Sequence, residues 1–137
     1  MRTASRILIL IGAIFSIIMA TTFVIVGLVF LGIAADKASL IEGINNGSIH
    51  TSTPGTPEEQ AAVLQLTFQI IAYVFLVIAF INICNTVISF VARKVQSNAL
   101  YITCLILGFI SFVEINSFGS IFGLIANKKE ATKVLNE

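Results

Sequence analysis

Residues 108–123 read GFISFVEINSFGSIFG, an apolar run with a carboxylate, Glu114, and an amide, Asn116, in its middle. The run belongs to a longer apolar stretch, residues 99–126, so its polar centre decides how often the chain crosses a membrane. If that stretch is one helix, Glu114 lies near mid-bilayer at a cost of roughly 2.5 kcal/mol or more. If the chain reverses at residues 114–117, both polar groups reach water or head groups.

The composition is that of an integral membrane protein. Of 137 residues, 57% are hydrophobic and 11% are charged, with a mean hydropathy of +1.00, whereas a soluble domain carries about 25% charged residues. Two further apolar stretches, residues 7–35 and 61–92, exceed the ~20 residues that cross a ~30 Å hydrocarbon layer as a helix. Since no strand-like alternation is visible, helices are the only plausible spanning elements.

Basic residues set the orientation in the membrane. Arg2 and Arg6 precede the first apolar stretch, and the short connection at residues 93–98 is also basic. Because Lys and Arg favour the cytoplasmic side, we expect a multi-pass plasma-membrane protein with its N-terminus in the cytoplasm. The lysines of residues 128–137 return to that side only if the stretch 99–126 turns back. We therefore favour a hairpin there, with both termini cytoplasmic.

These arguments predict an all-α, polytopic helical membrane bundle with four transmembrane segments, of which the last two are short. Three long helices are the alternative. The chain is expected to be one membrane domain, residues 1–137, whose parts are a helix at 7–35, an outer loop at 36–56, a helix at 57–92, an inner connection at 93–98, a helix at 99–113, a turn at 114–117, a helix at 118–127 and a cytoplasmic tail at 128–137. Thr56 and Glu59 form a capping box that begins the second helix.

Small and amide side chains within the apolar stretches are candidates for helix packing. Gly119 and Gly123 form a GxxxG pattern, and Gly108 lies in the preceding segment. Asn82 and Asn85 are three residues apart, share one helix face, and are expected to bond across helices. A polar pathway through these amides is the alternative.

The residues needed for catalysis are sparse. The chain has one histidine, His50, and lacks HExxH, CxxC and GxSxG motifs. Glu58 and Glu59 are better explained as helix capping than as an acid and base pair. We therefore expect no enzyme, no cofactor, no metal site and no identifiable small-molecule substrate. A net charge of +1 with no large basic patch also predicts no nucleic-acid partner.

Four longer segments resemble a known family. They read RILILIGAIFSIIMATTFVIVGLVFLGI, ARKVQSNALYI, CLILGFISF and GSIFGLIANKKE. Together they resemble a family of small, uncharacterised membrane proteins of Gram-positive bacteria, catalogued as a domain of unknown function with four predicted transmembrane segments. The resemblance implies a topology and a compartment, but no reaction and no site residues.

Three hypotheses for function follow. The first is a non-catalytic accessory, regulatory or protective (immunity-like) subunit that binds another membrane protein, or itself, through helix contacts. This hypothesis is motivated by the length of the first two helices, whose apolar residues extend beyond the bilayer, for example at 27–35 and 63–71. Apolar surface outside the lipid favours cover by a partner or by a second copy. The alternatives are a holin-like or pore-forming self-assembling protein, and a small transporter or ion-coupled subunit. The last would use Asn82 and the possible functional carboxylate Glu114, if Glu114 is membrane-embedded.

Overall fold

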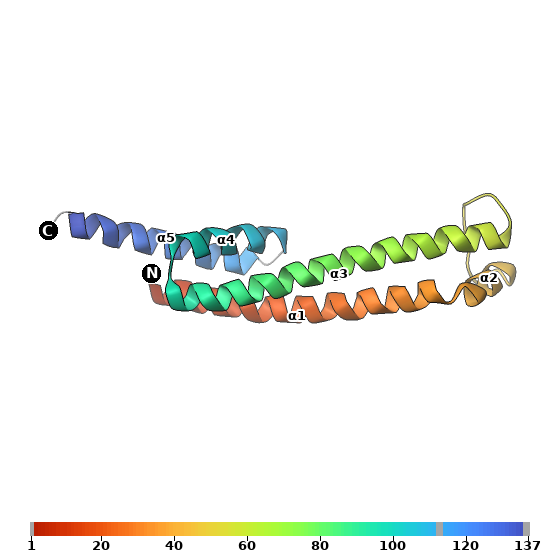
Figure 1. Ribbon diagram of the computed structural model, residues 1–137, viewed down its shortest axis with the longest axis horizontal. Coiled ribbons are helices and arrows are strands. Elements are labelled where there is room, and N and C mark those ends of the chain that lie inside the picture. Colours follow the sequence, from red (N-terminus) through yellow and green to blue (C-terminus); the bar gives the residue numbers. More distant parts are fainter. Residues whose placement is uncertain (1, 112–113, 136–137) are drawn as a thin grey trace. The chain divides into compact units, whose positions relative to one another are not determined.

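The computed structural model describes residues 2–111 and 114–135. Those residues are helical or irregular, with no strand among them, which confirms the all-α prediction. The elements in chain order are α1 (Arg2–Ala35), α2 (Lys37–Asn45), α3 (Pro57–Val95), α4 (Asn98–Ile110) and α5 (Glu114–Leu135) (Figure 1). Among them, α1 and α3 are long and apolar enough to cross a membrane. The other two predicted spans stay a prediction.

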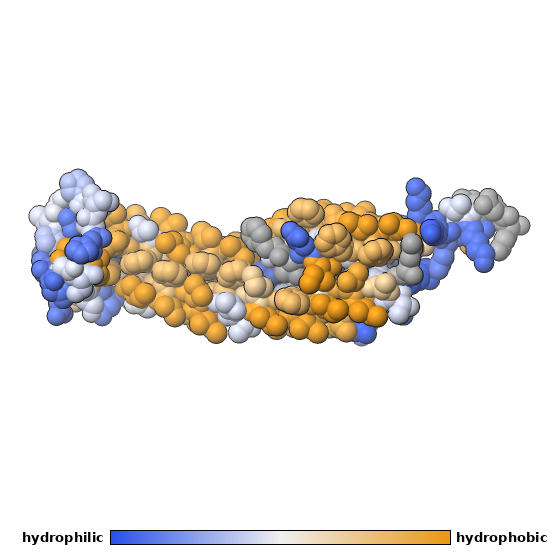
Figure 2. All heavy atoms as spheres, turned by 180° about the vertical axis from the view of Figure 1, so that it is seen from behind, coloured by the Kyte–Doolittle hydropathy of each residue, from blue (hydrophilic) through white to orange (hydrophobic). Residues whose placement is uncertain are grey.

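The chain divides into two compact units where the sequence predicted one domain. Unit 1 is Met1–Thr21 with Ile78–Glu137, and unit 2 is Thr22–Val77. Helices α1 and α3 each contribute to both units, whereas α2 belongs to unit 2 and α4 and α5 belong to unit 1. Exposed side chains on the helices are largely apolar, while hydrophilic residues gather over α2 and its loop and over the end of α5 (Figure 2).

In unit 1, α4 and α5 form the predicted helical hairpin (Figure 1). Near its turn, Ser117 Oγ donates to the carbonyl oxygen of Leu105 at 3.2 Å. At the open end, Asn127 Nδ2 donates to Asn98 Oδ1 at 2.8 Å. Early residues of α5 thus pair with late residues of α4, so the two helices run antiparallel and the chain reverses between them.

The predicted turn at residues 114–117 is wrong, because these residues form the first turn of α5. The chain leaves α4 at Ser111, whose backbone N–H bonds the carbonyl oxygen of Leu107 at 2.8 Å. The end predicted for helix 99–113 falls partly on residues 112–113, outside the described residues. The turn was placed on the polar residues because they were assumed to need water. Asn116 instead finds hydrogen-bond partners inside the protein.

Helix α5 is longer than predicted. It continues to Leu135, where the sequence analysis expected a helix at 118–127 and an irregular tail. No glycine or proline follows Gly123, and the Lys, Glu, Ala and Leu residues beyond it favour helix. Glu130 in this segment also pairs with Arg2 of α1. The first two predicted helices are similarly extended, since α1 begins at Arg2 and α3 ends at Val95.

The predicted outer loop contains a short helix, α2. Asp36 caps it, because its carboxylate accepts from the backbone N–H and the hydroxyl of Ser39, at 3.1 and 2.6 Å. The predicted capping box at the start of α3 is confirmed. Thr56 N donates to Glu59 Oε2 at 2.9 Å, and Glu59 N donates to Thr56 Oγ1 at 3.3 Å.

Aromatic side chains join the two long helices in unit 2. Phe30 of α1 stacks on Phe68 and Phe75 of α3, with ring centroids 5.7 and 6.0 Å apart. Phe23 stacks on Phe75 at 5.7 Å. These half-buried rings link α1 and α3 within unit 2, whereas the fully buried apolar residues of the unit are small or aliphatic, such as Ala34, Leu40 and Ala72.

Candidate functional site

The interior of unit 1 is polar. We call its buried polar side chains the polar column; they are Ser5, Ser16, Asn82, Asn85, Thr86, Ser89, Ser111, Asn116, Ser117 and Ser120. The column combines small hydroxyls with amides and holds no charged group. Small residues let helices approach closely, and their hydroxyls and amides bond across the interface. The column therefore gives unit 1 a specific packing inside an apolar exterior.

Asn85 joins three helices at one level of the column. Its Nδ2 donates to Ser16 Oγ of α1 at 3.1 Å and to Ser111 Oγ, at the end of α4, at 3.0 Å. Ser111 Oγ in turn donates to the carbonyl oxygen of Gly108 at 3.4 Å. The predicted bonding of Asn85 across helices is thus observed. These contacts also place Ser111, the last described residue after α4, near Ser16 in the middle of α1.

Asn116 forms a second set of contacts between helices in the polar column. Its Nδ2 donates to Ser89 Oγ of α3 at 3.0 Å, and its side chain lies directly on Gly12 of α1. A Cβ added at Gly12 would meet Asn116 Oδ1 at 2.0 Å and its backbone nitrogen at 2.9 Å. The absence of a side chain at Gly12 therefore lets α5 and its amide fit against α1.

Two of the three predicted packing glycines, Gly119 and Gly123, lie in close contacts in unit 1, and the third, Gly108, is buried in α4. A Cβ at Gly119 would meet the backbone nitrogen of Ile9 at 2.9 Å, and one at Gly123 would meet Tyr101 Cζ at 2.5 Å. Ser5 Oγ donates to the carbonyl oxygen of Gly119 at 2.7 Å. The two glycines of the GxxxG pattern therefore bring α5 against α1 and α4 within the chain.

Three amide oxygens of the column have no hydrogen-bond partner among the described residues. They are Oδ1 of Asn82, Asn85 and Asn116, and all three side chains are 0% exposed. Asn82 differs from the others because its Nδ2 donates to Ile78 of its own helix, at 3.0 Å, instead of bonding across helices. Buried carbonyl-type oxygens left without donors accept hydrogen bonds from water or coordinate a cation when either is present.

Glu114 lies outside the column. It is exposed in the first turn of α5, two residues before the buried Asn116. Phe118, four residues later and therefore on the same face of α5, is apolar and 57% exposed. The structure therefore does not unite Glu114 with Asn82 in one interior site, as the transporter hypothesis required.

The sequence analysis missed the part of the column contributed by α1. Ser5, Gly12 and Ser16 recur at intervals of seven and four residues, which places them on one helix face. A run of small residues at this spacing was the available signal for a packing face.

Among the described residues, no group of three or more His, Cys, Asp and Glu residues is arranged to hold a metal ion. Comparisons with protein-family models, with curated proteins and with solved structures find no match to this chain.

Proposed function

We propose that this chain is a non-catalytic accessory subunit of the plasma membrane that binds a different membrane protein through helix contacts centred on Glu114. The observation that carries the proposal is an exposed carboxylate on a helical hairpin that also exposes many large apolar side chains.

The first step is that the α4–α5 hairpin faces lipid. Its large exposed side chains are apolar on both helices: Ile102, Ile106, Phe109, Ile110, Phe118, Ile121, Phe122 and Ile125. A soluble protein rarely exposes so continuous an apolar surface. The hairpin is therefore best accommodated within the hydrocarbon layer, beside the membrane-length helices α1 and α3.

The second step is the depth of Glu114. Ser111, at the end of α4, is level with Ser16 and Asn85, because Asn85 Nδ2 donates to the hydroxyls of both Ser16 and Ser111. Ser16 follows Arg6 by ten residues, about 15 Å of helix, and Asn85 precedes Arg93 by eight residues, about 12 Å. With these arginines at the cytoplasmic boundary, the hairpin turns near the middle of a ~30 Å layer. It enters and leaves on one side, with both termini cytoplasmic.

The third step is the partner's chemistry. A carboxylate facing lipid at mid-depth costs roughly 2.5 kcal/mol or more, which a cationic or hydrogen-bond-donating neighbour offsets. The sequence has no Lys or Arg between Arg6 and Lys37, between Lys37 and Arg93, or between Lys94 and Lys128. A second copy in the same orientation therefore has no cation at this depth. The fitting partner is a different protein with a Lys, Arg or amide donor in a transmembrane helix.

The test uses a photo-reactive phenylalanine analogue in place of Phe118, one helical turn from Glu114. We expect a covalent adduct with a different membrane protein, which is lost when Glu114→Lys is added. The same analogue in place of Leu66, in unit 2, is the control. An adduct only with a second copy, or none beyond the monomer, would reject the accessory function. An adduct unchanged by Glu114→Lys would keep that function and reject the role of Glu114.

A second candidate is an ion-coupled subunit, favoured by the unpartnered oxygens of Asn82, Asn85 and Asn116. Oxygen ligands of this kind coordinate sodium in transporter interiors. The candidate predicts sodium uptake into proteoliposomes that is abolished by Asn85→Leu and unaffected by Glu114→Gln. Uptake no greater than in protein-free vesicles would reject it.

A further inference from the structure

A pocket of about 390 Å³ lies in unit 1 and is lined by residues from α1 and α3. Its lining residues are Arg6 of α1 and Phe90, Arg93 and Lys94 of α3. The three cations come from the first turns of one helix and the last turns of the other. Two guanidinium groups and an ammonium group therefore border one opening, which is an arrangement suited to a phosphate.

The charge of this pocket is not neutralised within the described part of unit 1. The acidic residues of that part are Glu114, which lies at the far end of the hairpin, and Glu130. Glu130 is already engaged, because it forms an ion pair with Arg2. The side-chain amide of Gln96, oriented with its oxygen toward α1, accepts from the guanidinium of Arg6. That neutral contact holds Arg6 in place and leaves its charge available.

The wall of the pocket on the membrane side is apolar. Phe90, the apolar lining residue one turn before Arg93 and Lys94, is 41% exposed, and Ile7, outside the lining but next to Arg6 in the sequence, is 53% exposed. Both lie toward the lipid-facing stretches of their helices. An anion that reaches the cations therefore places whatever is attached to it against hydrocarbon. This arrangement favours a phosphate that carries acyl chains over a free phosphate ion.

We infer that Arg6, Arg93 and Lys94, with Phe90, form a binding site for the phosphate of an anionic phospholipid. Basic pockets between membrane helices on the cytoplasmic side bind such head groups, and the cytoplasmic leaflet is the anionic one. Guanidinium groups supply paired donors that match phosphate oxygens, and the lysine adds a point charge. The inference is independent of the proposed partner, because the pocket lies at the opposite end of the hairpin from Glu114.

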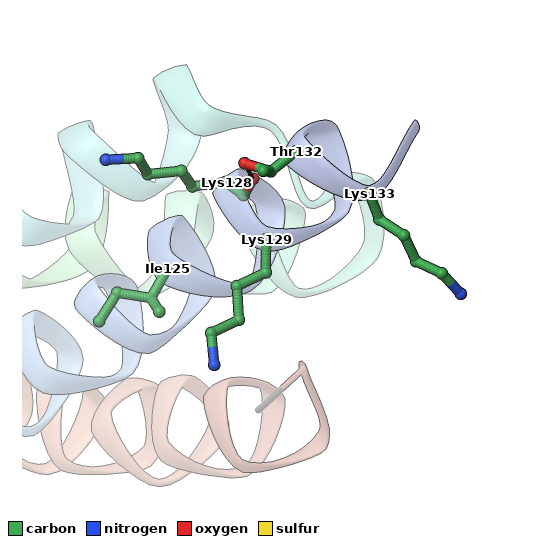
Figure 3. Close-up of a pocket in the computed structure, with 5 residues that line it drawn as sticks. All are labelled: Ile125, Lys128, Lys129, Thr132 and Lys133. Atoms are coloured by element: carbon green, nitrogen blue, oxygen red, sulfur yellow. Dashed lines mark hydrogen bonds between the residues drawn. The ribbon is translucent and has the colours of Figure 1, made fainter. Parts of the chain in front are cut away.

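The lysines at the end of α5 provide a matched control. Lys128, Lys129 and Lys133 border a second hollow with Ile125 and Thr132, and Figure 3 shows their ammonium groups pointing in different directions from a single helix. This surface has similar charge but no guanidinium group and no second helix as a wall. It attracts anions by charge alone.

The experiment measures lipid binding by the full chain in mild detergent, using native mass spectrometry with added phosphatidylglycerol, cardiolipin or phosphatidylcholine. We expect retained anionic lipid and little phosphatidylcholine. The double variant Arg6→Gln, Arg93→Gln should bind at least about tenfold more weakly, since each basic residue contributes about 1 kcal/mol near anionic lipid. The control Lys128→Gln, Lys129→Gln removes the same charge and should bind within about threefold of the original.

Three outcomes would overturn the inference. Equal losses in the two double variants would mean non-specific charge attraction. Displacement of lipid by millimolar inorganic phosphate would assign the pocket to free phosphate instead. Unchanged lipid binding in Arg6→Gln, Arg93→Gln would remove the site. Arg6→Lys, Arg93→Lys keeps the charge and the fold, so its intermediate affinity separates loss of the paired donors from misfolding of the double glutamine variant.

Discussion

Replacing Gly12 with alanine tests the closest approach in unit 1. The added Cβ would lie 2.0 Å from Asn116 Oδ1 and 2.9 Å from the backbone nitrogen of the same residue. Rotating the amide away would relieve the first contact and break its bond to Ser89. The second contact involves backbone, so α5 itself must also move away from α1.

The expected loss of stability has two parts. Overpacking of a tight interface costs about 1–3 kcal/mol. The lost bond from Asn116 to Ser89 adds about 0.6 kcal/mol, the average for side-chain hydrogen bonds between membrane helices, and up to about 1.7 kcal/mol. We therefore expect Gly12→Ala to lower the free energy of unfolding by about 2–4 kcal/mol.

Gly32→Ala is the matched control in the same helix, because a Cβ there meets nothing within 4 Å. It should leave stability unchanged or raise it by up to about 1 kcal/mol through helix propensity. The assay is unfolding in mixed detergent micelles followed by circular dichroism. Combining Gly12→Ala with Asn116→Ala removes the nearest clashing atoms, so the double variant should lose less than the sum of the single losses. Equal stability of the Gly12 and Gly32 variants would refute the contact between α1 and α5.

Three further predictions follow from other parts of the chain. Gly123→Ala should lower the unfolding free energy by about 1–3 kcal/mol in the same assay, because its Cβ would lie 2.5 Å from the Tyr101 ring. The pKa of Asp36 is lowered by its hydrogen bonds from Ser39, first from the hydroxyl and then from the backbone. The stabilisation of α2 by the Asp36 cap should therefore be present above pH 3.8, the ordinary pKa, and be lost as pH falls below it. Amide hydrogen exchange in α2 measures this loss. The Asp36→Asn variant should remove the pH dependence. A cysteine at Lys133 should react with a membrane-impermeant maleimide from the cytoplasmic side alone, and labelling from outside would refute the hairpin topology.

The sequence was sufficient to predict the long helices and the reversal of the chain. Apolar length predicted α1 and α3, and the pairing of Thr56 with Glu59 marked where α3 begins. The charge argument for a hairpin before the lysine-rich end also predicted the α4–α5 pair. These features depend on composition and short-range order along the chain, which a single sequence displays directly.

The position of Asn116 could not be predicted in the same way. An amide taken alone is costly in lipid, so the sequence argument placed it in water. The cost of burying this amide is offset by contacts with residues distant in the sequence. Ser89, which accepts its hydrogen bond, is 27 residues away, and Gly12, which makes room for it, lies on the first helix. The helical end of α5 was missed for a related reason, because the ion pair from Glu130 to Arg2 joins residues 128 apart. The short helix α2 was also missed, although its start could have been predicted. Asp36, an acidic residue before a short amphipathic run, is a local signal for a helix N-cap.

Unit 1 buries many polar side chains but leaves Glu114 exposed. This contrast supports the proposal that Glu114 contacts another molecule. Among its described residues, unit 1 buries ten polar side chains, and amides as large as Asn85 and Asn116 are 0% exposed. A fold that accommodates these groups has the hydroxyls and amides needed to receive a carboxylate. Glu114 is nevertheless exposed, although Asn116 two residues later is buried. Helix dipole attraction at the start of α5 contributes about 0.3–1 kcal/mol, which is smaller than the cost of exposing a charge to lipid. If the hairpin lies in the membrane as proposed, internal stability does not account for this position, which supports the proposed contact with an external cation or hydrogen-bond donor.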